Sequence, residues 1–167
     1  MMRVMGFLFA LAGAAALALL AFTSLRIGYA ELRAMDARAL ASGWKGRPQV
    51  ASTEAWNRAR ARLIEARALD ARNPSYPEEL AWLYDYRTLA MPRANALAAA
   101  YLRQALEYLR AAAPMRPGSP YNWASIALVK SKLAEYDAEF ERAYGNAARL
   151  GPWTPEVRAV LAETRRR

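Results

Sequence analysis

The feature that most constrains this chain is an uncharged run of 22 residues, from Val4 to Leu25, with Arg3 before it and Arg26 after it. As an α-helix the run is about 33 Å long, which matches the hydrocarbon thickness of a bilayer. Apolar residues cover all of its faces and leave no polar stripe, which argues against a buried helix of a soluble protein. The sequence therefore predicts a single transmembrane helix, a membrane anchor over residues 1–25.

The residues that flank this helix bear on its processing and its orientation. A cleaved signal peptide has a shorter apolar run and a small-residue cleavage site, whereas Phe22, Ile27 and Tyr29 occupy the region where that site would lie. The basic residues after the run favour a cytoplasmic body. A basic stub followed at once by an apolar helix has the layout of a secretory signal, however, and long downstream domains cross the membrane largely regardless of charge. We expect an uncleaved anchor in a bacterial inner membrane, with the soluble domain in the periplasm.

Residues 26–52 are expected to form a juxtamembrane helix and a linker. Small and apolar side chains recur at helical spacing from Arg26 to Ala41, in a helix that could continue the membrane span. Two glycines and a proline within residues 42–48 then oppose any regular element.

The composition excludes several kinds of chemistry. The chain has no cysteine and no histidine, so it has no thiol nucleophile, Cys/His zinc site, imidazole acid–base group or disulfide. The remaining acid–base candidates are carboxylates, in the pair Glu78/Glu79 and in the cluster Glu135, Asp137, Glu139 and Glu141. Glu78 is better explained as a helix cap, and the cluster as acids that favour the dipole at a helix start. We expect no enzymatic activity, no cofactor and no metal, and keep a carboxylate-dependent glycan enzyme as the weakest alternative.

A 34-residue repeat begins at Pro120. The pattern of a tetratricopeptide-type helix hairpin, with Trp at position 4, a large apolar residue at 7, a small one at 8 and an aromatic at 17, is met by Trp123, Ile126, Ala127 and Tyr136. The later positions fit after one extra residue in the second helix, and Lys130 stands where an aromatic residue is expected.

Two earlier units share this register. Counting backwards from Pro120 places Ala105, Leu109, Ala112 and Pro117 at repeat positions of a preceding second helix. The first helix of that unit follows Pro74, with Ser75 and Glu78 spaced as a capping box. Thr53–Leu69 is then the second helix of a first unit whose own first helix is missing, with Gly43–Val50 in its place.

The predicted fold is all-α. An N-terminal single transmembrane helix precedes a short tetratricopeptide-like array of helical hairpins over residues 53–167, which ends in a C-terminal capping helix at Thr154–Thr164. Small residues at the repeated positions would let paired helices approach closely.

Part of the chain resembles a known family. The stretch from Ser119 to Lys130, with Glu135–Phe140 and the ending Leu150–Trp153, resembles the VpsP-type polysaccharide biosynthesis proteins. These are small, anchored helical-repeat proteins of bacterial exopolysaccharide systems. The similarity is sharpest over residues 119–160 and looser over residues 56–117. It implies a pathway and a location, and brings no catalytic residues with it.

Helix-hairpin repeats usually bind partners through the inner face of the first helix of each unit. On that face we expect partner-binding residues that mix aromatic and charged side chains, as peptide grooves do, namely Glu78, Trp82, Asp85, Tyr86, Tyr121, Leu128, Ser131 and Lys132. In so short an array the helix over Arg26–Ala41, or the last helix, could instead cover this face and make Trp82 and Leu128 core residues.

The net charge of +9 raises the question of an acidic partner. Arginines crowd the predicted helix over residues 53–69 and could meet anionic headgroups or an acidic glycan, although a solvated face is the commoner explanation. No nucleic-acid-binding motif is present, so nucleic acid is not expected. We expect a non-catalytic membrane-anchored scaffold or assembly subunit that contacts polysaccharide synthesis or export proteins and takes no small-molecule substrate. The alternative is a repeat adaptor of another envelope machine, such as a pilus or secretion system.

Overall fold

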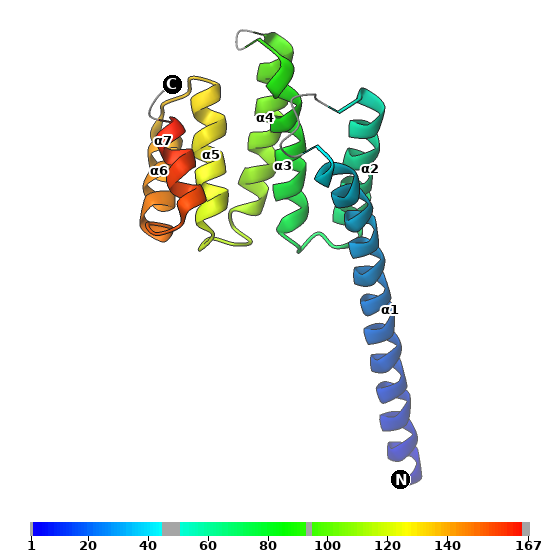
Figure 1. The fold of residues 1–167 in the computed structure, drawn as a ribbon. Helices are drawn as coiled ribbons and strands as arrows, with labels where there is room; N and C mark the ends of the chain where they lie inside the picture. The colour runs from blue at the N-terminus through cyan, green and yellow to red at the C-terminus, as the bar shows by residue number, and fades with distance from the viewer. Residues whose placement is uncertain (1, 45–50, 93–94, 165–167) are drawn as a thin grey trace.

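The computed structural model describes residues 2–44, 51–92 and 95–164. Over these ranges the chain forms only helices: α1 (Met2–Ser42), α2 (Thr53–Leu69), α3 (Ser75–Arg87), the short 3-10 helix η1 (Thr88–Ala90), α4 (Ala96–Ala112), α5 (Pro120–Lys132), α6 (Ala138–Leu150) and α7 (Pro155–Thr164) (Figure 1). The all-α class is confirmed. Residues 45–50 of the expected linker lie outside the described residues.

Helix α1 is continuous across the expected boundary at residue 25. Its first half projects away from the rest of the molecule (Figure 1), with exposed apolar side chains such as Leu17 and Leu25. Residues Leu11–Ser42 include a segment long and apolar enough to cross a membrane. The expected juxtamembrane helix is therefore the second half of one long helix.

The second half of α1 packs against α2. The contact uses small side chains, because Ala30, Ala34 and Ala37 are buried in the same core as Ala59 and Leu63 of α2. A helix thus packs against α2 where the sequence analysis expected only the segment Gly43–Val50. That helix is the second half of α1, whose alanine face allows a close approach to α2.

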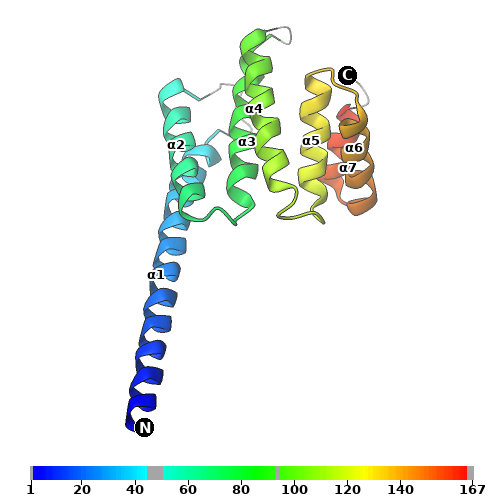
Figure 2. The same cartoon turned by 180° about the vertical axis from the view of Figure 1, so that it is seen from behind.

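The remaining helices continue the same pairing. Helix α3 packs against α4 and α5 against α6, while α2–α3 and α4–α5 contacts join one pair to the next. Figures 1 and 2 show α2, α4 and α6 on one side of the body and α1, α3 and α7 on the other. Helix α7 closes the array on α5 and α6, where Val157 and Leu161 are buried with Ala124 and Ala147.

An aromatic cluster fills the core between α2, α3 and α4. The ring of Trp56 meets those of Tyr84 and Tyr101 edge-on, with centroids 5.3 and 5.6 Å away, and its Nε1 donates a hydrogen bond of 2.9 Å to the Leu83 carbonyl oxygen. The indole N–H is thus satisfied inside the core, as burial of a polar group requires.

Local caps begin several helices. The side-chain oxygens of Ser52, Asn95 and Asp137 accept hydrogen bonds from the first-turn N–H groups of α2, α4 and α6. The capping box expected at Ser75 and Glu78 was wrong. The backbone N–H of Ser75 donates to Asn73 Oδ1 at 3.0 Å, because a side chain two residues earlier forms this Asx turn.

Candidate functional site

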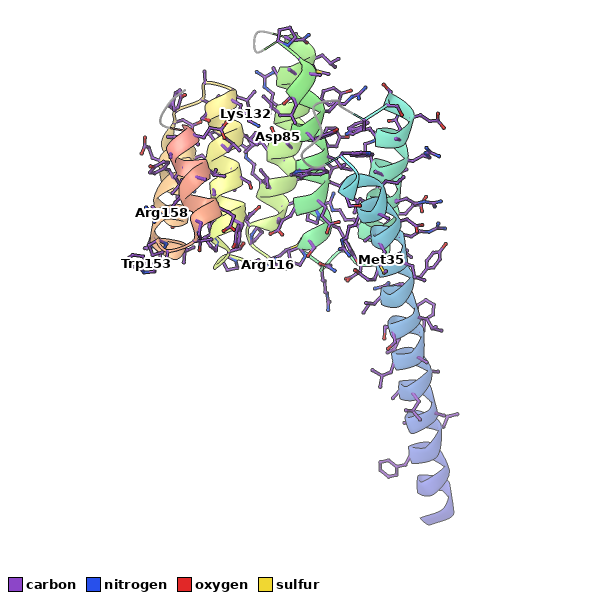
Figure 3. All side chains as sticks on the ribbon, in the orientation of Figure 1. Met35, Asp85, Arg116, Lys132, Trp153 and Arg158 are labelled. Atoms are coloured by element: carbon purple, nitrogen blue, oxygen red, sulfur yellow. The ribbon has the colours of Figure 1, made fainter. Side chains whose placement is uncertain are left out.

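The predicted partner-binding residues lie on α3 and α5, which the structure joins by an ion pair. Lys132 Nζ at the end of α5 donates to both carboxylate oxygens of Asp85 on α3, at 2.6 and 2.7 Å. Figure 3 shows the two labelled residues in the space between these helices. Asp85 and Lys132 are therefore brought together, and the pair holds the second and third helix pairs in register.

Tyr86 is not an open groove residue, contrary to the hypothesis. Its ring stacks between Trp44 and Trp82, with centroid distances of 5.6 and 5.3 Å, and its side chain is only 6% exposed. The hydroxyl oxygen accepts a hydrogen bond of 2.9 Å from the backbone N–H of Ala51. Trp44 and Ala51 thus cover this part of α3, and Tyr86 is a packing residue.

Trp82 is half-buried against the main core and borders a cavity of about 300 Å³ between α1, α2 and α3. Arg38 and Glu79 also line this cavity, and Arg38 Nε donates to Glu79 Oε1 at 2.8 Å. Burial is the largest influence on Glu79 and raises its pKa, although Arg38 beside it acts in the opposite direction. Helix α1 thus reaches the α3 end of the predicted face through Arg38, and Trp82 still borders the cavity there.

Glu78 faces the next loop along the array. Its Oε2 lies 3.4 Å from Arg116 Nη1, in the connection between α4 and α5. Partial burial raises the pKa of Glu78 despite this cation, since a charged carboxylate loses hydration there. The contact ties α3 to the loop before α5.

The α5 half of the predicted face is more accessible at one end than at the other. Tyr121 is 55% exposed, Leu128 is half-buried, and Ser131 is buried with its hydroxyl donating to the Leu128 carbonyl oxygen at 2.9 Å. A second cavity of about 300 Å³ lies beside Lys132. Tyr121 is therefore accessible at the start of α5 and Lys132 borders a cavity at its end, while α7 packs on α5 at Ala124 between them.

A charged network on the opposite side of α5 was not anticipated as a unit. The Lys130 side chain is 1% exposed, and its Nζ lies 2.8 Å from Asp137 Oδ2, 2.9 Å from Glu139 Oε2 and 3.5 Å from Glu135 Oε2. Arg110 of α4 donates two further hydrogen bonds to Glu139, at 2.8 and 2.6 Å. The signal in the sequence was Lys130 itself, a cation at a position where the repeat pattern expects an aromatic residue.

The electrostatics of this network keep Asp137 and Glu139 ionised. Hydrogen bonds from Arg110 and then Lys130 lower the pKa of Glu139 to about 2, and the bond from Lys130 likewise lowers the pKa of Asp137. The pKa of Lys130 is raised even though burial opposes it, because Asp137 and Glu139 accept hydrogen bonds from its ammonium group. Acids held in the charged form are poor proton donors, so the cluster acts as a clamp between α4, α5 and α6.

The arginines of α2 are partly used for packing. Arg60 donates to the Tyr84 hydroxyl oxygen at 3.2 Å and lies over the Trp56 ring, while Arg67 lies over Tyr108. Arg58 is exposed. The basic helix is therefore not one free cationic face. Among the described residues no cluster of acidic side chains could hold a metal ion.

Comparison with other proteins leaves the site to be interpreted from its geometry. No known protein family matches the chain. No curated protein matches it either.

Proposed function

We propose that the protein is a non-catalytic, membrane-anchored scaffold or assembly subunit that supports synthesis or export of a cell-envelope exopolysaccharide. The observation that carries this proposal is the continuity of α1, which runs without a break from an exposed apolar half into the core of the helical body. Such a helix would hold the helical body, and with it the surface on α3 and α5, at a fixed distance from the membrane.

The body is proposed to be a tetratricopeptide-like array. This is supported by buried alanines at the close-contact positions of the repeat, all without exposed surface: Ala59, Ala66, Ala105, Ala112, Ala127 and Ala147. Repeats of this kind present an extended surface for protein partners. The ionised clamp carboxylates around Lys130 support a structural role for the acidic cluster.

The partner-binding surface is proposed to be the part of the predicted face that stays accessible. It comprises Tyr121, Leu128 and the Asp85–Lys132 pair, with Trp82 at its edge. An exposed aromatic beside half-buried apolar and charged groups is the composition of an interaction hot spot.

The pathway and the location rest on the resemblance to VpsP-type proteins. The partners would be polysaccharide synthesis or export proteins, and the body would lie in the periplasm on a single inner-membrane span. A pilus or secretion adaptor is the second candidate, since an anchored helical array would serve either machine. Neither nucleic acid nor a small-molecule substrate is part of the proposal.

Photo-crosslinking in living cells tests the partner. A photoreactive residue at Tyr121 or Leu128 is expected to capture polysaccharide synthesis or export proteins, whereas one at Leu97, exposed on α4, serves as the matched control. Capture of pilus or secretion components would favour the second candidate. Equal capture from Leu97 would remove the α3–α5 surface from consideration.

Fractionation tests the anchor. Because α1 carries an uncharged span, the full-length protein is expected to stay with membranes after carbonate extraction, and release into the soluble fraction would contradict the anchor. A reporter active only outside the cytoplasm, fused after Arg167, is expected to be active. An inactive fusion beside an active cytoplasmic reporter would reverse the orientation.

A further inference from the structure

Three loops meet at the end of the body from which α1 projects. Helices α2, α4 and α6 end there and α3, α5 and α7 begin there, so the connections at residues 70–74, 113–119 and 151–154 lie together (Figure 1). Figure 3 shows Arg116 and Trp153, from two of these loops, at the same level as Met35 of α1. This end of the body therefore faces whatever surrounds the first half of α1.

The loop tips carry apolar side chains without cover. Trp153 is 88% exposed and Met115 is 40% exposed, with Pro114, Pro117 and Pro152 exposed beside them. The other tryptophans described, such as Trp56, are buried or half-buried. An exposed indole is unfavourable in water but suits the headgroup level of a bilayer, where its ring is apolar and its N–H stays hydrated.

The charges at this end favour an anionic surface. Exposed arginines lie in or beside each loop, at Arg72, Arg116 and Arg149. Together with Arg26 they outnumber the acids Asp70, Glu78 and Glu156, of which Glu78 lies 3.4 Å from Arg116. Arg26 adds an exposed positive charge directly after the uncharged span. Arginines near a membrane surface are attracted to anionic lipids.

The height of this end above the bilayer is compatible with contact. Met35 lies ten residues beyond Leu25, which is about 15 Å along an α-helix, and the headgroup layer occupies about 6 Å of that distance. Two helix spacings place the outer loops about 20 Å to the side of α1. A tilt of about 20° toward the body, common for membrane-spanning helices, then lowers them by about 7 Å. The side chains of Trp153 and Met115 are long enough to span the distance of about 2 Å that remains between the loops and the headgroup layer.

We propose that this loop end, with Trp153 and Met115 at its tips, docks on the anionic phospholipid headgroups of the bilayer that α1 crosses. The inference rests on the proposed membrane span of α1. Docking would hold the body in one orientation and direct the surface from Tyr121 to Lys132 sideways along the membrane, toward membrane-embedded partners.

Lipid quenching of single fluorescent labels tests this contact in the full-length protein. The chain contains no cysteine, so Met115→Cys, Leu89→Cys and Leu17→Cys each give one site for an environment-sensitive dye. The proteins are reconstituted into vesicles of phosphatidylglycerol and phosphatidylcholine that carry a spin-labelled headgroup. We expect quenching and a blue-shifted emission at position 115, and neither at position 89, which is exposed on η1 at the opposite end.

Two variants separate docking from mere proximity to the anchor. Trp153→Ser and Arg116→Gln, checked for an unchanged thermal melt, are each expected to reduce quenching at position 115, and loss of one arginine contact shifts the docking equilibrium about fivefold. Vesicles of phosphatidylcholine alone are expected to show weaker quenching. Quenching that is unchanged in both variants, or in neutral vesicles, would overturn the proposal.

Position 17 distinguishes this proposal from the anchor. Vesicles with a spin label on the lipid acyl chain test the dye at position 17, which would lie inside the bilayer. Quenching of that dye without headgroup quenching at position 115 would overturn the docking and leave the anchor intact. An unquenched label at position 17 would overturn both. Self-quenching between labels at position 115, without lipid quenching, would assign this end to a second copy of the chain and overturn the lipid contact.

Discussion

Replacing Glu139 by glutamine removes the one carboxylate that Lys130 and Arg110 share. Glu139 Oε2 lies 2.9 Å from Lys130 Nζ and 2.6 Å from Arg110 Nη2. The Lys130 side chain is almost fully buried, whereas Arg110 reaches solvent. The substitution keeps the shape of the side chain and deletes its charge, so the loss of stability reports mainly on the buried ammonium group.

The size of the stability loss depends on which carboxylate partners Lys130 keeps in the variant. Breaking a fully buried ion pair costs about 3–5 kcal/mol because the remaining charge is uncompensated, whereas an exposed pair contributes about 0.2–1 kcal/mol. In the Glu139→Gln variant Lys130 still has Asp137 Oδ2 at 2.8 Å, so the loss lies between these limits. We expect the free energy of unfolding to fall by about 2 kcal/mol, a shift of about 8 °C in the melting temperature for a body of this size.

Two companion variants isolate the buried charge. Asp137→Asn keeps the helix cap of α6, because asparagine caps as well as aspartate, and removes only the charge next to Lys130. Asp137→Asn is expected to lower the free energy of unfolding by less than Glu139→Gln does, since Asp137 is exposed. Lys130→Met is expected to change stability by less than about 1 kcal/mol, because the released carboxylates are near solvent and a buried ion pair often exchanges for apolar packing at little cost.

Melts of the full-length protein in detergent, followed by circular dichroism, measure these effects. In the Lys130→Met background, Glu139→Gln is expected to cost less than half of what it costs in the wild type. An equal cost in both backgrounds would assign the whole effect to Arg110 and refute the clamp around Lys130. A wild-type melt for Glu139→Gln would refute it as well.

Three further outcomes are expected from the same melts. Ala105→Leu should cost about 1–3 kcal/mol by overpacking the α3–α4 contact, and the exposed Ala100→Leu should not; equal melts would show that the repeat register is wrong. Gly151→Ala should destabilise the body, since a Cβ there would come within 2.8 Å of the Pro120 side chain, whereas Gly145→Ala, with open space around it, should stabilise α6 by about 1 kcal/mol. On acidification, the stabilising contribution of Glu139 is present above about pH 4.5 and is lost as the pH falls toward its folded pKa of about 2; a Glu139→Gln variant with an unchanged acid dependence would contradict this.

The local signals of the sequence predicted the individual helices well. Thr53–Leu69, the start of α5 at Pro120 and the last helix to Thr164 all lie where the sequence analysis expected them. Caps, prolines and apolar spacing act over a few residues, so they can be recognised without knowledge of neighbours. The exception at Ser75 is itself local, because Asn73 competes for the same backbone N–H.

The candidate site could be predicted only in part. Its position on α3 and α5 was predicted from the sequence. The ion pair between Asp85 and Lys132 was not, because it depends on how closely the ends of these two helices approach. The burial of Tyr86 does not, because it depends on Trp44 and Ala51, residues more than thirty positions away that fold over α3.

The sequence by itself determined which segments are helical, that the first of them is apolar enough for a membrane, and that cysteine and histidine chemistry is absent. The tertiary structure decided which helices become neighbours. It placed the alanine face of α1 against α2, gathered three carboxylates around Lys130, and brought Met115 and Trp153 to the end from which α1 leaves. The physical reason is that helix formation depends on residues three or four positions apart, whereas burial and ion pairing depend on surfaces that meet only after the chain has folded.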